Sequence, residues 1–352
     1  QEGSAIGPGT EVADIETTKI TTALETERSG TLRRTVANEG ETLPVGAIIG
    51  VIADPTVPDA EIDRFIEEFQ AKFAEAAEAG ETVAQIEPVF VDVGGRRLRY
   101  LKMGEGDTPM VFLHGFAGNL NSWPFNQTIL AKARATYALD LPGHGESSKD
   151  VGKGTLDSLA RTVVEFMAAV DIPGAHLVGH SLGGALAVEV AREHPDRAAS
   201  LTLICSAGLG AEIDGEFIDG VITANRRKEI KPYLERLFAD TSLVSRDLVN
   251  DVLKFKRLDG ADQALRNIAK NVFPNGKQAK VLVETLRELS IPIQVIWGRD
   301  DRIIPVGHAE TVRGMVPVHV VEAAGHMVHM ESAAEINRLI DAFVGNGGGG
   351  GI

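Results

Sequence analysis

The stretch His176–Gly184 reads HLVGHSLGG, and it decides the fold class of the chain. It opens with an apolar run typical of a buried strand, and Gly184–His194 then has the apolar spacing of a helix. Gly179, Ser181 and Gly183 occupy the turn between them. A strand–turn–helix with this Gly-X-Ser-X-Gly pattern predicts a nucleophilic serine, and an ordinary glycine-rich turn is the alternative.

A serine hydroxyl becomes a useful nucleophile only when an imidazole accepts its proton and an acid orients that imidazole. Asp300 and Asp301 directly follow one apolar strand, and His326 directly follows another. The carboxyl ends of parallel strands meet at one edge of a sheet, so these groups are expected near Ser181. His329 falls on a predicted helix and is expected to pack or cap there.

The negative charge that develops on the substrate oxygen must also be stabilised by hydrogen-bond donors. The turn at the serine places the N–H of Leu182 at the start of the predicted helix. Backbone N–H groups at that position have no partner within the helix and can bind an oxyanion.

From residue 89 onward, short apolar strands alternate with helices, which predicts a mainly parallel sheet with crossover helices. The rhythm stops between residues 207 and 290, where several amphipathic helices are expected instead. We expect that insertion to form a cap over the active site. Residues 346–352 form a glycine-rich tail with no evident chemistry.

The composition excludes several classes of function. The chain has 352 residues, and 35 Lys and Arg against 50 Asp and Glu give a net charge of −15. This acidic excess argues against binding to nucleic acid. Cys205 is the single cysteine, which rules out internal disulfides and permits a reducing compartment. No apolar run reaches the roughly 20 residues of a membrane span, so we expect a cytoplasmic protein without membrane contact.

The first 88 residues have a different character. Residues 1–53 contain short alternating runs of Thr, Val and Ile separated by turns, which predict a small all-β unit. Residues 54–88 begin with two Pro breaks and continue as an amphipathic helix from Asp59. We interpret the helix as a linker, and leave open whether it has a docking face or packs permanently on the following domain.

Over residues 89–345, five motifs in order resemble those of the α/β-hydrolase family: His114–Phe116, Asp140–Gly145, Gly179–Gly183, Gly298–Asp301 and Gly325–His326. The resemblance implies an α/β-hydrolase fold with Ser181, Asp301 and His326 as catalytic triad. The family spaces its acid three residues after a glycine, which favours Asp301 over Asp300. It also implies that Phe116 N–H joins Leu182 N–H as oxyanion donor.

The first 53 residues resemble the lipoyl and biotinyl carrier domains, in which a lysine at a hairpin tip bears the cofactor. Lys19 lies between two predicted strands within the sequence Glu16-Thr17-Thr18-Lys19, which looks lipoyl-like. The resemblance implies a lipoyl group on Lys19. Only eighteen residues precede this lysine, so we expect the opening strands of a carrier domain to be missing.

A lipoyl carrier joined to an α/β-hydrolase domain resembles the acetyltransferase components of acetoin-cleaving complexes. The resemblance implies transfer of acetyl from lipoyl-lysine to coenzyme A through a serine acyl-enzyme. It also implies thiamine-dependent acetoin dehydrogenase subunits and dihydrolipoyl dehydrogenase as partners, and a homo-oligomer. The alternatives are a serine hydrolase with a vestigial carrier module and a non-catalytic carrier subunit.

Overall fold

The computed structural model describes residues 2–7, 10–16, 21–26, 29–43, 47–78 and 87–345. The chain divides into two compact units, Gln1–Ile86 and Glu87–Ile352. Lys19 and the glycine-rich tail, residues 346–352, lie outside the described residues.

The first unit is built from short antiparallel strands. β2 (Glu11–Glu16) pairs with β3 (Thr21–Glu25), with Glu16 opposite Thr21. A second sheet has the order β1-β4-β5, and its strands are β1 (Ala5–Ile6), β4 (Gly30–Thr35) and β5 (Gly50–Ala53). Both sheets are small, as expected for alternating runs of only a few residues each.

Helix α1 (Asp59–Glu78) belongs to this same unit and contacts strand β4. Arg33 Nη2 lies 2.6 Å from Asp59 Oδ1, and Arg34 Nε lies 2.9 Å from Asp63 Oδ1. Both ion pairs are partly exposed, so each stabilises the contact only modestly. They hold the first turns of the helix against strand β4.

The second unit is organised around one sheet of eight strands in the order β13-β12-β11-β10-β8-β9-β7-β6. Strand β7 pairs antiparallel with both of its neighbours, β9 and β6, and the other pairs of this sheet are parallel. The strands are β6 (Val89–Val93), β7 (Arg96–Met103), β8 (Met110–Leu113), β9 (Thr136–Leu139), β10 (Ala175–His180), β11 (Ala198–Ile204), β12 (Ile293–Gly298) and β13 (Val318–Val321). The predicted mainly parallel sheet is confirmed.

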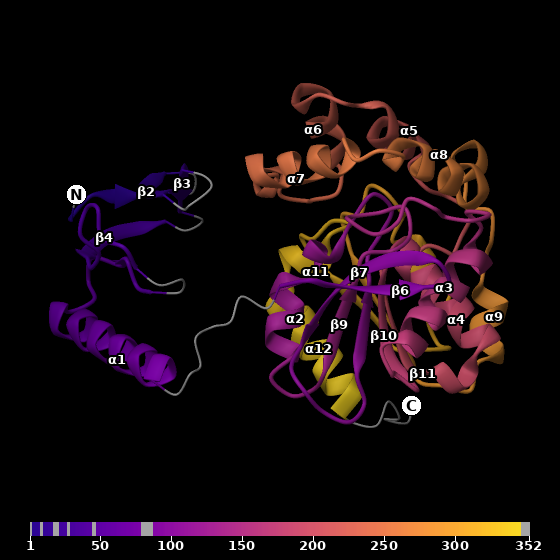
Figure 1. The fold of residues 1–352 in the computed structure, drawn as a ribbon, viewed down its shortest axis with the longest axis horizontal. Helices are drawn as coiled ribbons and strands as arrows, with labels where there is room; N and C mark the ends of the chain where they lie inside the picture. The colour runs from indigo at the N-terminus through magenta and orange to yellow at the C-terminus, as the bar shows by residue number, and fades with distance from the viewer. Residues whose placement is uncertain are drawn as a thin grey trace. The chain divides into compact units, whose positions relative to one another are not determined.

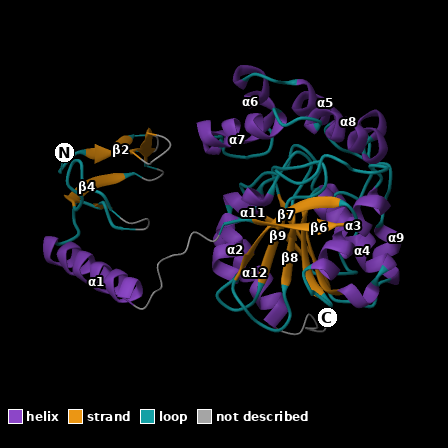
Figure 2. Ribbon diagram, in the orientation of Figure 1, coloured by secondary structure: helices purple, strands orange, loops and turns teal. Residues whose placement is uncertain are grey.

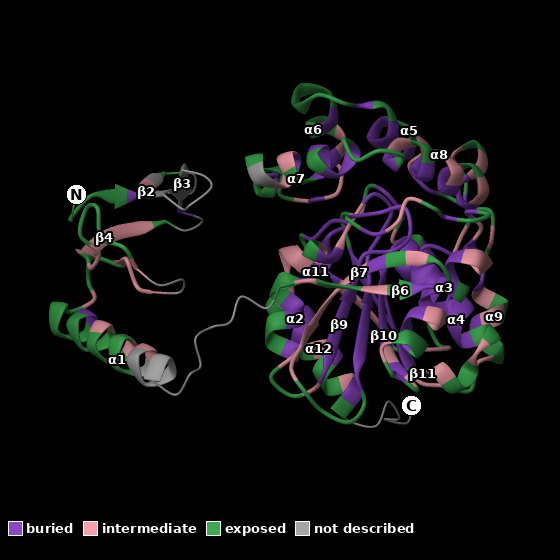
Figure 3. Ribbon diagram, viewed as in Figure 1, coloured by how far each residue is buried: buried purple, intermediate pink, exposed green. Residues whose placement is uncertain are grey.

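Helices cover both faces of this sheet, as Figures 1 and 2 show. One layer contains α2 (Pro124–Leu130), α11 (Val328–Glu331) and α12 (Ala333–Gly345), and the other contains α3 (Leu156–Ala169), α4 (Leu182–Glu193) and α9 (Val283–Glu288). Every residue of strands β8, β9 and β12 is therefore buried. Figure 3 shows that buried residues gather in this central sheet. Burial on two faces explains why these strands are continuous apolar runs instead of alternating ones.

A cap of four main helices follows strand β11. It comprises α5 (Gly215–Thr223), α6 (Arg227–Glu235), α7 (Arg246–Lys256) and α8 (Ala261–Val272), all within the segment 207–290 (Figure 1). The buried Lys256 ammonium donates to the carbonyl oxygens of Val221 and Ile222, each at 2.7 Å. A cation satisfies the last carbonyls of α5 in this way and joins it to α7. Among the described residues, no helix combines the length and apolar character needed to cross a membrane.

Candidate active site

A sharp turn between β10 and α4 presents Ser181, whose backbone has φ +52° and ψ −117°. Neighbouring chain segments pass very close to this turn. A Cβ on Gly179 would lie 2.3 Å from the carbonyl oxygen of Gly183, and one on Gly183 would lie 2.0 Å from that of Leu113. No side chain fits at these distances, so the strained serine exists only between glycines.

His326 and Asp301 form a buried pair at the ends of their strands. His326 Nδ1 donates to Asp301 Oδ2 at 2.8 Å, and the side chains are 2% and 0% exposed. The other oxygen, Oδ1, accepts the N–H groups of Ile303 and Ile304 at 2.8 and 3.0 Å. Three donors therefore fix the Asp301 carboxylate, whereas the neighbouring Asp300 is exposed. The structure thus pairs the histidine with Asp301.

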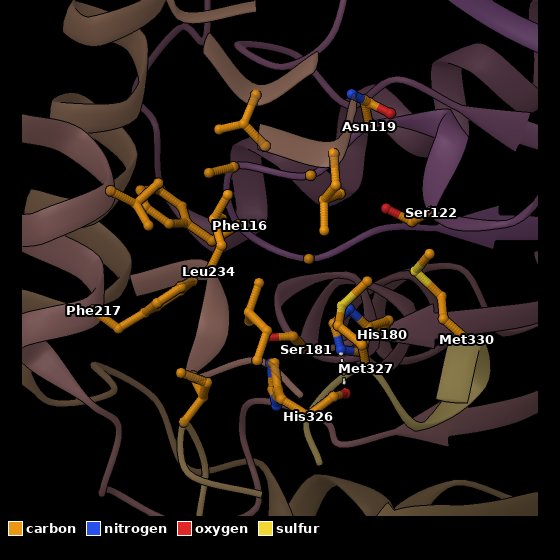
Figure 4. Close-up of a pocket in the computed structure, with 18 of the residues that line it drawn as sticks. Phe116, Asn119, Ser122, His180, Ser181, Phe217, Leu234, His326, Met327 and Met330 are labelled. Carbon is orange, nitrogen blue, oxygen red and sulfur yellow. Dashed lines mark hydrogen bonds between the residues drawn. The ribbon is translucent and has the colours of Figure 1, made fainter. Parts of the chain in front are cut away.

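Ser181 and His326 line the same cavity, shown in Figure 4. His180 also lines it, and its Nε2 donates to the backbone carbonyl of His326 at 2.9 Å. This bond holds the histidine loop against the serine turn. With Asp301 at the far nitrogen, the other ring nitrogen of His326 is the one available to the serine hydroxyl.

The two candidate oxyanion donors, the N–H groups of Leu182 and Phe116, belong to two different loops. Leu182 is the first residue of α4, where its N–H has no acceptor within the helix. Phe116 lines the cavity and follows a tightly held turn. There, His114 Nε2 accepts the N–H of Leu141 at 3.0 Å, so its Nδ1 donates to the Gly115 carbonyl at 2.8 Å. His114 is thereby fixed as a neutral ring that shapes the turn.

Sequence reasoning missed Glu331, whose carboxylate joins the histidine loop to the cap. Its Oε2 accepts the N–H of Gly325 at 2.6 Å, and its Oε1 accepts those of Ala239 and Asp240 at 2.7 and 3.2 Å. Hydrogen bonds to a charged acceptor are stronger than neutral ones. Glu331 therefore positions the residue next to His326 relative to the end of the cap helix α6.

Two further residues connect the same cap segment to the loops that carry Asp301 and His326. Arg302, beside Asp301, donates to the carbonyls of Glu235 and Phe238, and Met327 N–H donates to Leu237 O at 2.9 Å. Gly325 is required by this packing, because a Cβ there would lie 2.7 Å from Ala239 N. The backbone of this cap segment occupies the space that a side chain at position 325 would need.

A column of buried aromatic rings lies behind His326. The rings of His180 and His326 are 4.6 Å apart between centroids, those of His180 and His329 are 4.6 Å apart, and Trp123 stacks beyond. Burial, and then the charge of nearby His326, lowers the pKa of His329 to about 3. Burial likewise lowers the pKa of His180 far below its ordinary value. Both rings are therefore neutral in the working enzyme.

Among the residues that the structure describes, two groups of side chains have the spacing of metal ligands, and neither fits a metal ion. Cys205 lies beside Asp301 and His326, but burial raises the pKa of its thiol well above the ordinary value, and the other two residues bind each other. The second group, Asp157, Glu189 and Glu193, is neutralised by the side chains of Lys280 and Arg192. Cys205 is thus a neutral, fully buried residue.

Comparison with known proteins agrees with this geometry. Residues 108–333 match the family model described as alpha/beta hydrolase fold. The chain is 46% identical over 98% of its length, and 92% of the relative's, to a protein of Pseudomonas putida named dihydrolipoyllysine-residue acetyltransferase component of acetoin cleaving system. A protein of Cupriavidus necator with the same name is 41% identical, over 98% of this chain and 91% of the relative.

The chain belongs to the α/β-hydrolase family and, within it, to these acetyltransferase components. Its fold is also that of a meta-cleavage product hydrolase from Pseudomonas fluorescens, with a TM-score of 0.66 and 23% identity. That match covers 73% of this chain and 97% of the solved one. The predicted α/β-hydrolase fold and the family resemblance are both confirmed.

Replacing Glu331 by glutamine tests its positioning role. The variant keeps one acceptor oxygen but turns an NH₂ group toward an N–H that the carboxylate now satisfies. We expect kcat/KM for 4-nitrophenyl acetate to fall about tenfold or more, because small displacements of a catalytic group are costly. The matched control is Glu335→Gln, because Glu335 is an exposed carboxylate on α12. Equal kcat/KM values and pH profiles for both variants would show that Glu331 does not position His326.

The buried His329 predicts acid sensitivity. Its pKa in the folded protein is about 3, so below pH 6.5 the unfolded chain binds a proton that the folded protein does not. Stability is complete above pH 6.5 and declines as the pH falls, by about 2 kcal/mol at pH 5 for one such histidine. Urea unfolding between pH 7.5 and 5 should therefore show a shallower decline in His329→Gln than in the wild type. Parallel declines would contradict this account of the ring.

Proposed function

We propose that this protein is an acyltransferase that moves an acetyl group from a lipoyl thioester to coenzyme A, with Ser181 as the transient acceptor. The observation that carries the proposal is that the strained Ser181 lines one cavity with His326, which is bonded to the buried Asp301. The identity along nearly the whole chain to named acetyltransferase components supports the same reaction.

In the first half-reaction, the Ser181 oxygen attacks the thioester carbonyl carbon while His326 takes the hydroxyl proton. Asp301 orients the ring and stabilises the imidazolium that forms. The N–H groups of Phe116 and Leu182 hold the negative oxygen of the tetrahedral intermediate. His326 then returns the proton to the departing sulfur as the carbon–sulfur bond breaks, which leaves an acetyl ester on Ser181.

In the second half-reaction, His326 removes the proton from the acceptor thiol, and its sulfur attacks the ester carbonyl. The same two N–H groups bind the oxyanion. The bond between the carbonyl carbon and the Ser181 oxygen breaks, and His326 gives its proton back to that oxygen. The serine is regenerated and the acetyl group leaves as a thioester, so no net oxidation or hydrolysis has occurred.

The proposal includes a lipoyl group attached to Lys19. Residues 1–53 form the carrier domain and residues 54–88 the helical linker. Residues 89–345 form the catalytic domain, with its cap at 207–290. Support comes from strands β2 and β3, which pair in an antiparallel hairpin whose ends, Glu16 and Thr21, flank the connection that contains Lys19. A lipoyl group supplies a thiol that carries an acyl unit as a thioester. The aliphatic side chains of the cavity suit the hydrocarbon part of such an arm.

The proposed context follows from the family. We place the protein in the cytoplasm, as a homo-oligomer in a complex with thiamine-dependent acetoin dehydrogenase subunits, which supply the acetyl group. Dihydrolipoyl dehydrogenase would reoxidise the dithiol. Neither nucleic acid nor membrane has a part in this scheme.

Ser181→Ala tests the acyl-enzyme. We expect acetyl transfer to coenzyme A to fall at least about a thousandfold, because residues of a triad act as a unit. Ser242→Ala, an exposed cap serine, is the control. Thioester and free acetate are measured together by mass spectrometry. Normal transfer by Ser181→Ala would refute the mechanism, and acetate as the sole product of the wild type would identify a hydrolase instead.

Lys19→Arg tests the attachment site in the full chain expressed with a lipoate ligase. Arginine keeps the charge but cannot form the amide, so the mass increase of lipoylation should disappear. Hydrolysis of 4-nitrophenyl acetate should remain within twofold of the wild type, since that ester reaches Ser181 directly. Lys102→Arg, in strand β7, is the matched control. A lipoylated Lys19→Arg protein would place the cofactor on another lysine.

A further inference from the structure

The cavity at Ser181 has walls of two different chemical kinds. Its volume is about 120 Å³, similar to apolar cavities that hold a small organic molecule. One wall comes from the cap helices and is mostly aliphatic or aromatic; its members are Phe217, Ile218, Val221, Leu234, Leu248 and Val252. The other comes from the chain after β8 and carries Asn119, Asn121 and Ser122. In Figure 4, Asn119 and Ser122 lie on the opposite side of Ser181 from Phe217.

The polar wall has hydrogen-bonding capacity to spare. Asn119 Oδ1 accepts the N–H of Asn121 at 2.8 Å, which leaves the Asn119 amide NH₂ for a ligand. Within the part of the chain that the structure describes, the side chains of Asn121 and Ser122 have no hydrogen-bond partner. Asn121 is exposed and Ser122 half-buried, so an entering molecule can reach both.

This wall is also rigid. Its residues form a short 3₁₀ turn, Leu120–Ser122, and the buried Asp140 carboxylate accepts the N–H of Leu120 at 2.7 Å. The other oxygen of Asp140 accepts the N–H of Glu146 at 2.9 Å, and Trp123, directly after the turn, is fully buried. Polar groups that are held in place before binding lose little entropy when a ligand arrives.

The proposed reaction brings two different thiols to the same acetyl-serine. In the pantetheine arm of coenzyme A, an amide lies two carbons from the sulfur and a second amide follows. In the dihydrolipoyl arm, the sulfur-bearing carbons continue into plain hydrocarbon. An amide that loses water without gaining partners is unfavourable, and hydrocarbon gains nothing from polar groups. The two walls therefore match the two arms.

Resting on the proposed function, we infer that Asn119, Asn121 and Ser122 form the acceptor subsite, which recognises the amides of the pantetheine arm. The cap wall then receives the acyl donor. The described lining includes Asp251 and no lysine or arginine. Recognition within the cavity is thus directed at the arm, and the phosphates of coenzyme A remain outside it.

The test compares two acceptor thiols, pantetheine and 1-butanethiol, with 4-nitrophenyl acetate as the acyl donor. Thioester formation gives kcat/KM for each thiol, and the initial burst of 4-nitrophenol reports acylation of Ser181. In Asn121→Ala/Ser122→Ala, we expect kcat/KM for pantetheine to fall about tenfold, the size of one or two lost hydrogen bonds. The value for 1-butanethiol and the burst should stay within twofold. Asn225→Ala, an exposed asparagine of the cap outside the cavity, is the matched control.

The outcomes separate the subsite from the reaction. An unchanged value for pantetheine, or an equal fall for both thiols, would overturn the acceptor subsite while leaving the transferase intact. A wild-type protein that gives a burst but only acetate with every thiol would overturn the transferase function, and the subsite with it. A selective loss for pantetheine supports both.

Discussion

The close approach of chain segments at Ser181 is the constraint on which the catalytic unit depends. The neighbouring strands β8 and β10 carry the two loops that meet there, and a Cβ on Gly115 would lie 3.1 Å from Ser181 Cβ and 2.9 Å from His180 Nδ1. Glycine is therefore needed on both loops. In the proposed mechanism, these two loops also supply the oxyanion donors, the N–H groups of Phe116 and Leu182.

The cap both lines the cavity at Ser181 and contacts the loops that carry Asp301 and His326. Its segment between α6 and α7 touches the Asp301 loop through Arg302 and the His326 loop through Glu331 and Met327. The side chains of the same cap form the apolar wall of the cavity. The shape of the cavity and the position of the His326–Asp301 pair consequently both depend on how the cap packs on the second unit.

Electrostatics around His326 follow from burial. The ring of His180 packs against that of His326, and the ring of His329 packs against that of His180. Burial lowers the pKa of both His180 and His329, so that both remain uncharged. In the proposed mechanism an imidazolium forms at His326 in each half-reaction, and positive neighbours would oppose it. Neutral rings do not, while the buried Asp301 carboxylate favours it. The column of aromatic rings therefore adds no positive charge next to His326, the residue proposed to gain and lose a proton.

Much of this arrangement could be predicted from amino acids alone, because strand ends, glycine turns and helix starts depend on near neighbours in the chain. The strand–turn–helix at Ser181, the parallel sheet and the location of Asp301 and His326 at strand ends are of that kind. The choice between Asp300 and Asp301 rested on family resemblance, and only the fold shows which carboxylate turns inward. The part played by Glu331 left no trace in the sequence. Its partners in the cap are backbone N–H groups 91 and 92 positions away, which every residue except proline possesses, so only tertiary packing could select them.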